Sequence, residues 1–278
     1  MDFKTKLKNI FKKNNSLLCV GLDSEFDKIP EHLKEKEKKI DEVIFLFNKA
    51  IIDATVDLVC AYKANSAFYE AEGKEGIEAL RKTFHYLQDR YSEIILILDA
   101  KRGDISSTNE NYVKFAYDFL GADAITLHPY LGKEALRPFL DRADKGAIIL
   151  CRTSNPGAGE LQDIKINGRL LYQIIAEKIV KDWNYNGNCG VVVGATYPEE
   201  LNIVRRIIGE MPILIPGIGA QGADIEKTIR AGVDKNGVNA IINSSRKIIF
   251  AGKNADFAQK AKEEAKKLKE EINKCRGR

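Results

Sequence analysis

The sequence predicts an α/β protein built as one closed barrel of parallel strands. Short apolar runs alternate with segments of helical periodicity, which is the pattern of a parallel sheet with helical crossovers. This alternation occurs eight times, and a chain of 278 residues is an ordinary length for eight βα units. Together these observations favour a (β/α)8 TIM barrel over an open doubly wound sheet, with a single domain over residues 1–278.

Eight apolar runs are the expected strands, and polar or glycine-bearing residues follow each of them. They are residues 17–22, 58–62, 94–98, 124–127, 146–151, 189–193, 212–215 and 238–242. The run 94–98 is apolar throughout, as expected of a parallel strand that is covered on both faces.

The segments between these runs have the periodicity of helices. The expected helices are residues 43–56, 76–90, 109–120, 168–181, 198–208 and 223–231. A first helix precedes the first strand and is expected to cap the bottom of the barrel, with one apolar face made of Phe3, Leu7, Ile10 and Phe11. A last helix would complete the outer ring through Phe257, Ala261, Leu268 and Ile272.

The composition of the chain narrows the classes of molecule that it is expected to bind. The chain has 44 Lys and Arg against 40 Asp and Glu, a balance that argues against nucleic-acid binding. Its five cysteines include no C-x-x-C pair, which favours reduced thiols and therefore a cytoplasmic protein. No signal peptide or membrane span is expected, because no stretch approaches the length of about 18 apolar residues that a span needs.

Charged residues gather where the early strands end. Asp99 and Lys101 follow the third strand, Asp104 lies on the next turn, and Lys63 follows the second strand. An isolated Asp-x-Lys is usually a surface ion pair. Here the four charges of alternating sign would share the mouth of a barrel, where burial is costly unless the charges are paired. Function in such barrels collects at this end, so the four residues are candidate catalytic groups.

Two late segments predict a phosphate site. Residues 216–224 follow the seventh strand, and their glycines let backbone N–H groups approach an anion. After the eighth strand, Ser245 supplies a hydroxyl and Arg246 a guanidinium suited to bidentate contact. The loops after strands seven and eight are the usual phosphate site of these barrels.

The segment 155–160 follows the fifth strand and is expected to be a lid that closes over a ligand, with Gln162 nearby. An ordinary connection is the alternative. His128 also ends a strand, and a packing or orienting role is favoured for it because Lys101 already supplies a proton donor.

Taken together, these motifs resemble the orotidine 5′-phosphate decarboxylase family over nearly the whole chain. The resemblance rests on Asp-x-Lys-x-x-Asp at 99–104, Gly-Ala-Thr-x-Pro-Glu-Glu-Leu at 194–201, Pro-Gly-Ile-Gly-Ala-Gln-Gly at 216–222 and Ser-Ser-Arg at 244–246. The Thr-Ser-Asn-Pro segment at 153–156 resembles the longer branch of that family. The resemblance implies a cytoplasmic enzyme of pyrimidine biosynthesis that removes the carboxylate of orotidine 5′-phosphate to give UMP, without a metal or cofactor.

The resemblance also implies roles for individual residues. Lys101 would protonate C6 of the pyrimidine, Asp99 would stand beside the departing carboxylate, and Lys63 would link Asp99 to the ribose. The remaining substrate contacts would come from Asp23 and Asn65 on the ribose, Thr153 or Ser154 on the base, and Gly217, Gly219, Gln221, Ser245 and Arg246 on the phosphate. Asp104, Ile105 and Thr108 would reach into a neighbouring subunit's site, so a homodimer with shared sites is expected.

The physical chemistry agrees with a lysine at the centre of the reaction. Loss of CO2 from C6 leaves a carbanion with no adjacent electron sink, so electrostatic stabilisation must supply much of the roughly 8–23 kcal/mol that enzymes provide. Asp99 and Asp104 would favour the charged form of Lys101. They also argue against a Schiff-base aldolase, which needs a neutral amine.

Two alternatives stay open from the residues. The Asp-x-Lys-x-x-Asp pattern also resembles Mg2+-dependent sugar-phosphate decarboxylases or aldolases of the same barrel superfamily, which a chelator would inhibit. The chain could also be a barrel that binds a phosphorylated metabolite without turnover. That alternative would be expected if one of the four charged residues were missing, and all four are present.

Overall fold

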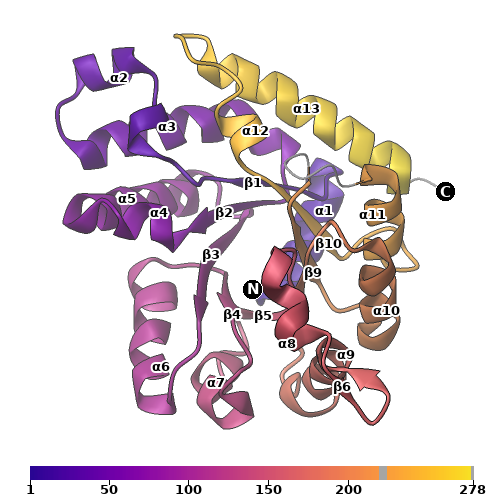
Figure 1. Ribbon diagram of the computed structural model, residues 1–278. Helices are drawn as coiled ribbons and strands as arrows, with labels where there is room; N and C mark the ends of the chain where they lie inside the picture. Colours follow the sequence, from indigo (N-terminus) through magenta and orange to yellow (C-terminus); the bar gives the residue numbers. More distant parts are fainter. Residues whose placement is uncertain (219–223, 277–278) are drawn as a thin grey trace.

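A computed structural model describes residues 1–218 and 224–276 of the chain. Eight parallel strands close into a barrel in the order β1-β10-β9-β8-β5-β4-β3-β2, with the helices arranged around them (Figure 1). The barrel strands are β1 (Leu18–Gly21), β2 (Ala61–Asn65), β3 (Ile95–Arg102), β4 (Ala124–Leu127), β5 (Gly146–Arg152), β8 (Cys189–Val193), β9 (Ile213–Pro216) and β10 (Ala240–Ser244). The predicted (β/α)8 barrel is therefore confirmed.

The helices cover the outside of the strands and alternate with them along the chain. They are α1 (Phe3–Asn14), α2 (Glu31–Lys36), α3 (Ile40–Thr55), α4 (Ser66–Glu70), α5 (Gly73–Arg90), α6 (Ser106–Val113), α7 (Gly132–Leu140), α8 (Gly159–Gln162), α9 (Leu171–Lys178), α10 (Pro198–Ile208), α11 (Ile225–Gly232), α12 (Arg246–Ile249) and α13 (Phe257–Arg276). None of the described helices is long and apolar enough to cross a membrane.

The strands are buried along nearly their whole length, because aliphatic side chains face both the barrel interior and the helices. Polar side chains enter the buried part of the sheet mainly toward the C-terminal ends of the strands. Lys63, Asp99, Thr126 and Asn243 are examples. This end of the barrel therefore concentrates the groups that can do chemistry.

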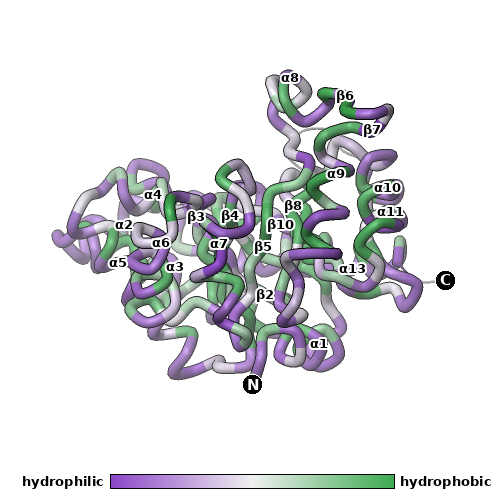
Figure 2. The backbone as a smooth tube through the Cα atoms, turned by 90° about the horizontal axis from the view of Figure 1, so that it is seen from below, coloured by the Kyte–Doolittle hydropathy of each residue, from purple (hydrophilic) through white to green (hydrophobic). Residues whose placement is uncertain are grey.

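The helix α1 packs at the opposite end. Its apolar face, formed by Phe3, Leu7, Ile10 and Phe11, is buried. The amide of Phe3 donates to the carbonyl of Asp144, just before β5, and Lys6 pairs with Asp123, just before β4, at 2.6 Å. Figure 2 shows α1 at one end of the barrel and α8 with the small β6–β7 hairpin standing above the other.

Several expected boundaries were wrong for identifiable reasons. The helix expected from Gly168 begins at Leu171, because β6 (Lys165–Ile166) and β7 (Arg169–Leu170) form a hairpin. Its turn is Asn167-Gly168, and both residues have a positive φ, the preferred pair for a two-residue turn. The helices expected over 109–120 and 168–181 both continue into π-helical segments, Lys114–Phe119 and Ile179–Trp183.

The second strand is also shifted. It was expected over 58–62 but runs from Ala61 to Asn65, so Lys63 and Asn65 lie within it. A lysine usually marks the end of a buried run. Here Asp23, just after β1, and Asp99 on β3 pair with the ammonium, which allows Lys63 to occupy an interior position.

Candidate active site

Lys63, Asp99 and Lys101 form a continuous chain of charges across the ends of β2 and β3. The Nζ atom of Lys63 lies 3.1 Å from Asp99 Oδ2 and 3.4 Å from Asp23 Oδ1. On its other side Asp99 accepts from Lys101, whose Nζ lies 2.7 Å from Oδ1. Lys63 is 2% exposed and Asp99 8%, whereas the side chain of Lys101 is 47% exposed. The buried Lys63–Asp99 pair therefore holds the more exposed ammonium of Lys101 at the barrel mouth.

The electrostatics of the pair keep both members charged. Burial alone would lower the pKa of Lys63, but the carboxylates of Asp23 and Asp99 outweigh it, so this pKa lies above its ordinary value. Burial would likewise raise the pKa of Asp99. The nearby ammonium groups of Lys63 and Lys101 and the hydrogen bonds to its carboxylate instead bring it well below the ordinary range.

Lys101 has an unusual backbone. Its φ of 46° lies in the left-handed region, which non-glycine residues seldom adopt outside functional sites and turns. It occupies a β-bulge at the end of β3, where the pairing with β4 shifts register between Leu98 and Arg102. The amide of Lys101 donates to Thr126 Oγ1 at 3.0 Å, and this hydroxyl donates to Asp99 Oδ1 at 2.8 Å. Sequence reasoning missed Thr126, since nothing in the sequence shows the bulge.

Asp104 does not join this cluster within its own chain. Its Oδ1 accepts from the amide of Ile105 at 2.7 Å, and no ion pair links it to Lys101 in the part of the chain that the structure describes. The buried side chain of Asn109 holds the turn, because it bonds both the amide and the carbonyl of Asp104. Ile105 is 60% exposed and Thr108 is half-buried, so this turn presents its side chains outward.

Asp23 and Asn65 lie together beside Lys63. Asp23 Oδ1 accepts from the amide of Asn65 at 3.0 Å as well as from Lys63. The Oδ1 atom of Asn65 accepts from the amide of Ala67 and caps α4, so its Nδ2 group is the part that can bond a ligand. A carboxylate next to an amide donor suits the hydroxyl groups of a sugar.

The expected phosphate segments begin side by side, because Pro216 at the end of β9 pairs with Asn243 in β10. Gly217 has a φ of 101°, a conformation that favours glycine. Ser245 is half-buried and Arg246 is exposed at the start of α12. Gly219 and Gln221 lie outside the described residues.

Gly21 at the end of β1 allows Ser245 to take its position. A Cβ atom on Gly21 would stand 1.8 Å from Ser245 Oγ. The hydroxyl also accepts from the side-chain amide of Asn243 at 3.3 Å. The close approach of β1 to the Ser245 segment therefore depends on a residue without a side chain.

The segment after β5 is tied down by its own side chains. Gln162 accepts from the amide of Thr153 and donates to its hydroxyl, both at 2.8 Å. The Thr153 hydroxyl donates to Asn155 Oδ1 at 2.6 Å, which uses its only hydrogen. Arg152 is buried, pairs with Asp163 at 3.1 Å and lies 4.2 Å from the Tyr197 ring centroid. Sequence reasoning missed the role of Arg152 in this anchor.

Comparison with known proteins identifies the family. The model of the "Orotidine 5′-phosphate decarboxylase / HUMPS family" matches residues 16–262. The chain is 47% identical over 251 residues to the orotidine 5′-phosphate decarboxylase of Cellvibrio japonicus (strain Ueda107), covering 90% of each chain. It is equally identical over 253 residues to that of Dechloromonas aromatica (strain RCB), covering 91% of this chain and 92% of the relative.

The chain belongs to this family.

Solved structures agree with this membership. The OMP decarboxylase of Leishmania donovani has a TM-score of 0.84 and 37% identity, with 99% of both chains covered. The UMP synthase of the same organism has a TM-score of 0.86 and 39% identity. The match covers 99% of this chain and 57% of that longer one.

Two further features bear on the site of this decarboxylase-family chain. A Cβ atom on Gly103 would stand 2.6 Å from His128 Nε2, so the imidazole packs directly over Gly103. This contact fits the packing role favoured for His128. No group of three or more His, Cys, Asp or Glu side chains that could hold a metal ion occurs in residues 1–218 and 224–276.

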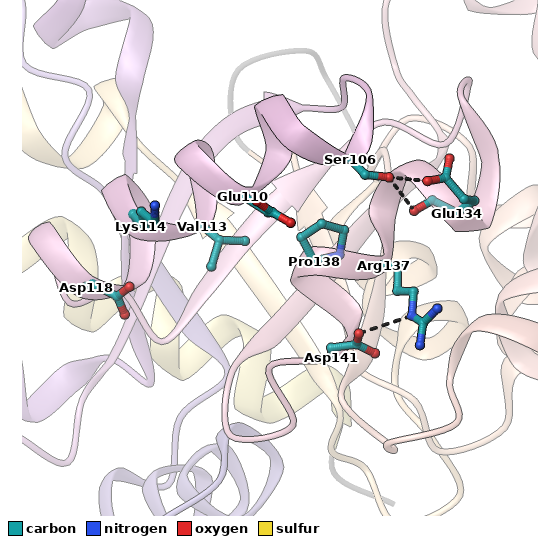
Figure 3. A pocket seen from close by; sticks show the side chains of 9 residues that line it. All are labelled: Ser106, Glu110, Val113, Lys114, Asp118, Glu134, Arg137, Pro138 and Asp141. Carbon is teal, nitrogen blue, oxygen red and sulfur yellow. Dashed lines mark hydrogen bonds and ion pairs between the residues drawn. The ribbon is translucent and has the colours of Figure 1, made fainter.

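A groove of about 580 Å3 lies outside the barrel, between α6 and α7 (Figure 3). Its lining mixes acidic and basic side chains of the outer helices with Val113 and Pro138. Ser106 donates to Glu134 across one end, and Arg137 bonds Asp141 at the other. Lys63, Asp99 and Lys101 do not line it, so the groove is distinct from the charged cluster.

Proposed function

We propose that Lys101 is the proton donor in the decarboxylation of orotidine 5′-phosphate to UMP. The activity follows from the family and from relatives that bear this name, and places the enzyme in pyrimidine biosynthesis. The observation that carries the role of Lys101 is its open ammonium, held 2.7 Å from the buried Asp99 at the barrel mouth. In the reaction the bond between C6 and the carboxylate breaks, CO2 leaves, and the electron pair remains on C6. Lys101 Nζ then transfers a proton to form the C6–H bond.

The charged cluster suits this chemistry because it is organised before the substrate binds. A fixed ammonium beside C6 stabilises the developing carbanion without reorganising solvent, which is the most effective form of electrostatic catalysis. Lys63 bonds the other oxygen of Asp99 and so fixes the carboxylate that orients Lys101. Asp99 would stand beside the departing carboxylate of the substrate.

The substrate would lie across the barrel mouth with its three parts on three groups of strands. We place the ribose on Asp23, Asn65 and Lys63, near β1 and β2. The phosphate would lie on the Gly217 backbone, Ser245 and Arg246, with Gly219 and Gln221 as further expected contacts. This end of the substrate is distant from the reacting bond, so its binding energy can order the site and close the lid.

Ser154 is the better candidate to contact the pyrimidine. The hydroxyl hydrogen of Thr153 is already donated to Asn155, and Gln162 bonds both the amide and the hydroxyl of Thr153. Ser154 packs against Gly194 at the end of β8, where a Cβ atom would stand 2.5 Å from Ser154 Cβ. Thr153 would then anchor the lid while Ser154 faces the base.

Ultraviolet absorbance tests the function directly. The purified protein should remove the absorbance band of orotidine 5′-phosphate with or without a chelator. A Lys101→Ala variant should lose at least about 10⁴-fold in kcat, since it removes both the proton donor and the fixed charge. Turnover that a chelator abolishes would instead support the Mg2+-dependent alternative. Binding without turnover would support the metabolite-binding barrel.

We propose further that the active enzyme is a cytoplasmic homodimer with shared sites. Asp104 bonds the amide of Ile105, and Ile105, Tyr130 and Leu131 expose apolar surface after β3 and β4. The surface near the site would be covered by a second copy, whose Asp104, Ile105 and Thr108 would enter the opposite site. Five free cysteines, four of them buried, suit a reducing compartment.

Mixing two inactive variants tests the shared site. Lys101→Ala and Asp104→Ala homodimers should each have very low activity. After subunit exchange in equal amounts, half of the dimers are mixed and each has one intact site, so about a quarter of wild-type activity should return. No recovery, with exchange verified by mass spectrometry, would place Asp104 in the site of its own chain.

A further inference from the structure

Thr126 stands at the point where the pairing of β3 with β4 changes register. Leu98 pairs with Ile125, and the next pair is Arg102 with Leu127. Asp99, Ala100 and Lys101 on β3 therefore oppose the single residue Thr126 on β4. The bulge creates space for the left-handed conformation of Lys101 and directs its side chain back toward Asp99.

The hydrogen bonds of Thr126 have only one possible direction. The amide of Lys101 can only donate, so Thr126 Oγ1 accepts from it at 3.0 Å. The carboxylate of Asp99 can only accept, so the hydroxyl hydrogen points to Oδ1 at 2.8 Å. The hydroxyl of Thr126, a residue that is 1% exposed, therefore joins the backbone of Lys101 to the carboxylate that pairs with its ammonium.

The carboxylate of Asp99 is therefore bonded at both of its oxygens. Oδ1 receives Thr126 and Lys101, and Oδ2 receives Lys63. Without the hydroxyl, the carboxylate would lose one restraint on rotation about its Cβ–Cγ bond, and the bulge would lose the bond to the Lys101 amide. Thr is also β-branched, which restricts rotation about its Cα–Cβ bond.

We propose that Thr126 is a positioning residue that sets the direction of the Lys101 ammonium. It acts through Asp99 and the Lys101 backbone and does not contact the substrate. The proposal rests on the roles proposed above for Lys101 and Asp99. It predicts that removing the hydroxyl impairs the chemical step more than the binding of substrate, because the displaced group acts mainly in the transition state.

The test compares three variants by steady-state kinetics with orotidine 5′-phosphate. Thr126→Val keeps the shape and removes the hydroxyl, and kcat should fall about 10- to 100-fold while KM changes less than about threefold. Thr126→Ser keeps the hydroxyl and should recover kcat to within about threefold of wild type. Thr83→Val is the matched control, since the buried Thr83 hydroxyl also donates once, to Ala79, and accepts once, from Asn48, but lies on α5.

The control separates positioning from general destabilisation. Thr83→Val should lower the melting temperature about as much as Thr126→Val and leave kcat within about twofold of wild type. If Thr126→Val does not fold, the same comparison is made with Thr126→Ala. Equal losses of kcat in both valine variants, or a serine variant as impaired as the valine one, would overturn the proposal.

The Lys101→Ala variant distinguishes a failure of the proposal for Thr126 from a failure of the proposed function on which it rests. If Lys101→Ala is inactive and Thr126→Val retains kcat within about twofold, Thr126 has no positioning role and the assignment of Lys101 stands. If Lys101→Ala remains active, the assignment of Lys101 fails and the proposal for Thr126 fails with it.

Discussion

At the ends of β2 and β3 the charged side chains bond one another, whereas after β9 and β10 the expected phosphate contacts are the Gly217 backbone, the Ser245 hydroxyl and the exposed guanidinium of Arg246. Lys63, Asp99 and Lys101 form a bonded chain. No ion pair of Arg246 with another residue occurs in the part of the chain that the structure describes, and its side chain is exposed.

This difference between the two regions matches two tasks, stabilising the transition state and binding the phosphate. The groups that stabilise a transition state work best when they are fixed beforehand, because reorganising them during the reaction costs free energy. Groups that hold a distant phosphate can be ordered by the ligand itself, since that binding energy then helps to assemble the site. We therefore expect changes at β2 and β3 to affect stability and kcat, and changes at β9 and β10 to affect KM.

Lys63→Met should have the largest effect on stability. It leaves the buried Asp99 and the half-buried Asp23 without their shared cation, and removing one partner of a buried pair costs about 3–5 kcal/mol of stability. We also expect kcat to fall about 100-fold or more, because Asp99 loses the bond to its Oδ2 atom. Urea denaturation and steady-state kinetics measure the two effects.

The matched control for Lys63 is Lys49→Met. Lys49 pairs with Asp53 at 2.6 Å on the surface of α3, with side chains 40% and 36% exposed. A pair so exposed contributes less than about 1 kcal/mol. Similar losses in the two variants would show that the buried cluster is not specially organised.

Arg246→Ala should weaken the binding of the substrate. Loss of a guanidinium that contacts a phosphate costs roughly 2–3 kcal/mol, so KM should rise about 30- to 150-fold. Lys247→Ala is the control, because Lys247 is the adjacent exposed cation on α12. The contrast between the two regions would break down if kcat fell strongly in the arginine variant while KM stayed constant.

The charged cluster should also make stability depend on pH. The pKa of Asp99 is lower in the folded protein than its unfolded value of about 3.9. Its contribution to the free energy of unfolding is therefore fully present above that value and is lost as the pH falls through the folded pKa. The difference in stability between wild type and Asp99→Asn should be largest near neutral pH and shrink below about pH 4. Denaturation curves from pH 7 to pH 3 measure it, and a constant difference would contradict the assignment.

The barrel itself could be predicted because its signals are periodic. The strands β4 and β8 and the helix α10 have the expected bounds, since an apolar run or a proline-initiated helix marks each of them. The errors arise where a tertiary contact overrides the local pattern. Lys63 lies inside a strand because Asp23, just after β1, and Asp99 on β3 pair with it, which no pattern within β2 shows.

Only part of the site could be predicted, because some of its contacts depend on the tertiary structure. The pairing of Asp99 with Lys101 follows from their spacing, but the left-handed backbone that completes it depends on a register shift against β4. The sequence does not contain that shift as a local signal, so the bonds of Thr126 were missed. Asp104 bonds the amide of Ile105 in its own chain, and its expected place in a neighbouring subunit's site stays a prediction.

The smallest predicted effect concerns the lid and decides between Thr153 and Ser154. Ser154→Ala should raise KM about tenfold, the cost of one hydrogen bond to the base. Thr153→Val keeps the bulk of the side chain but loses the bonds to Gln162 and Asn155, so the lid would close less often. A second variant, Gln162→Leu, should then resemble Thr153→Val in its kinetics, and adding it to Thr153→Val should cost little more. If the effects of these two changes are additive, Thr153 contacts the base itself. The lid after β5 would then belong to the part of the barrel mouth that the ligand orders.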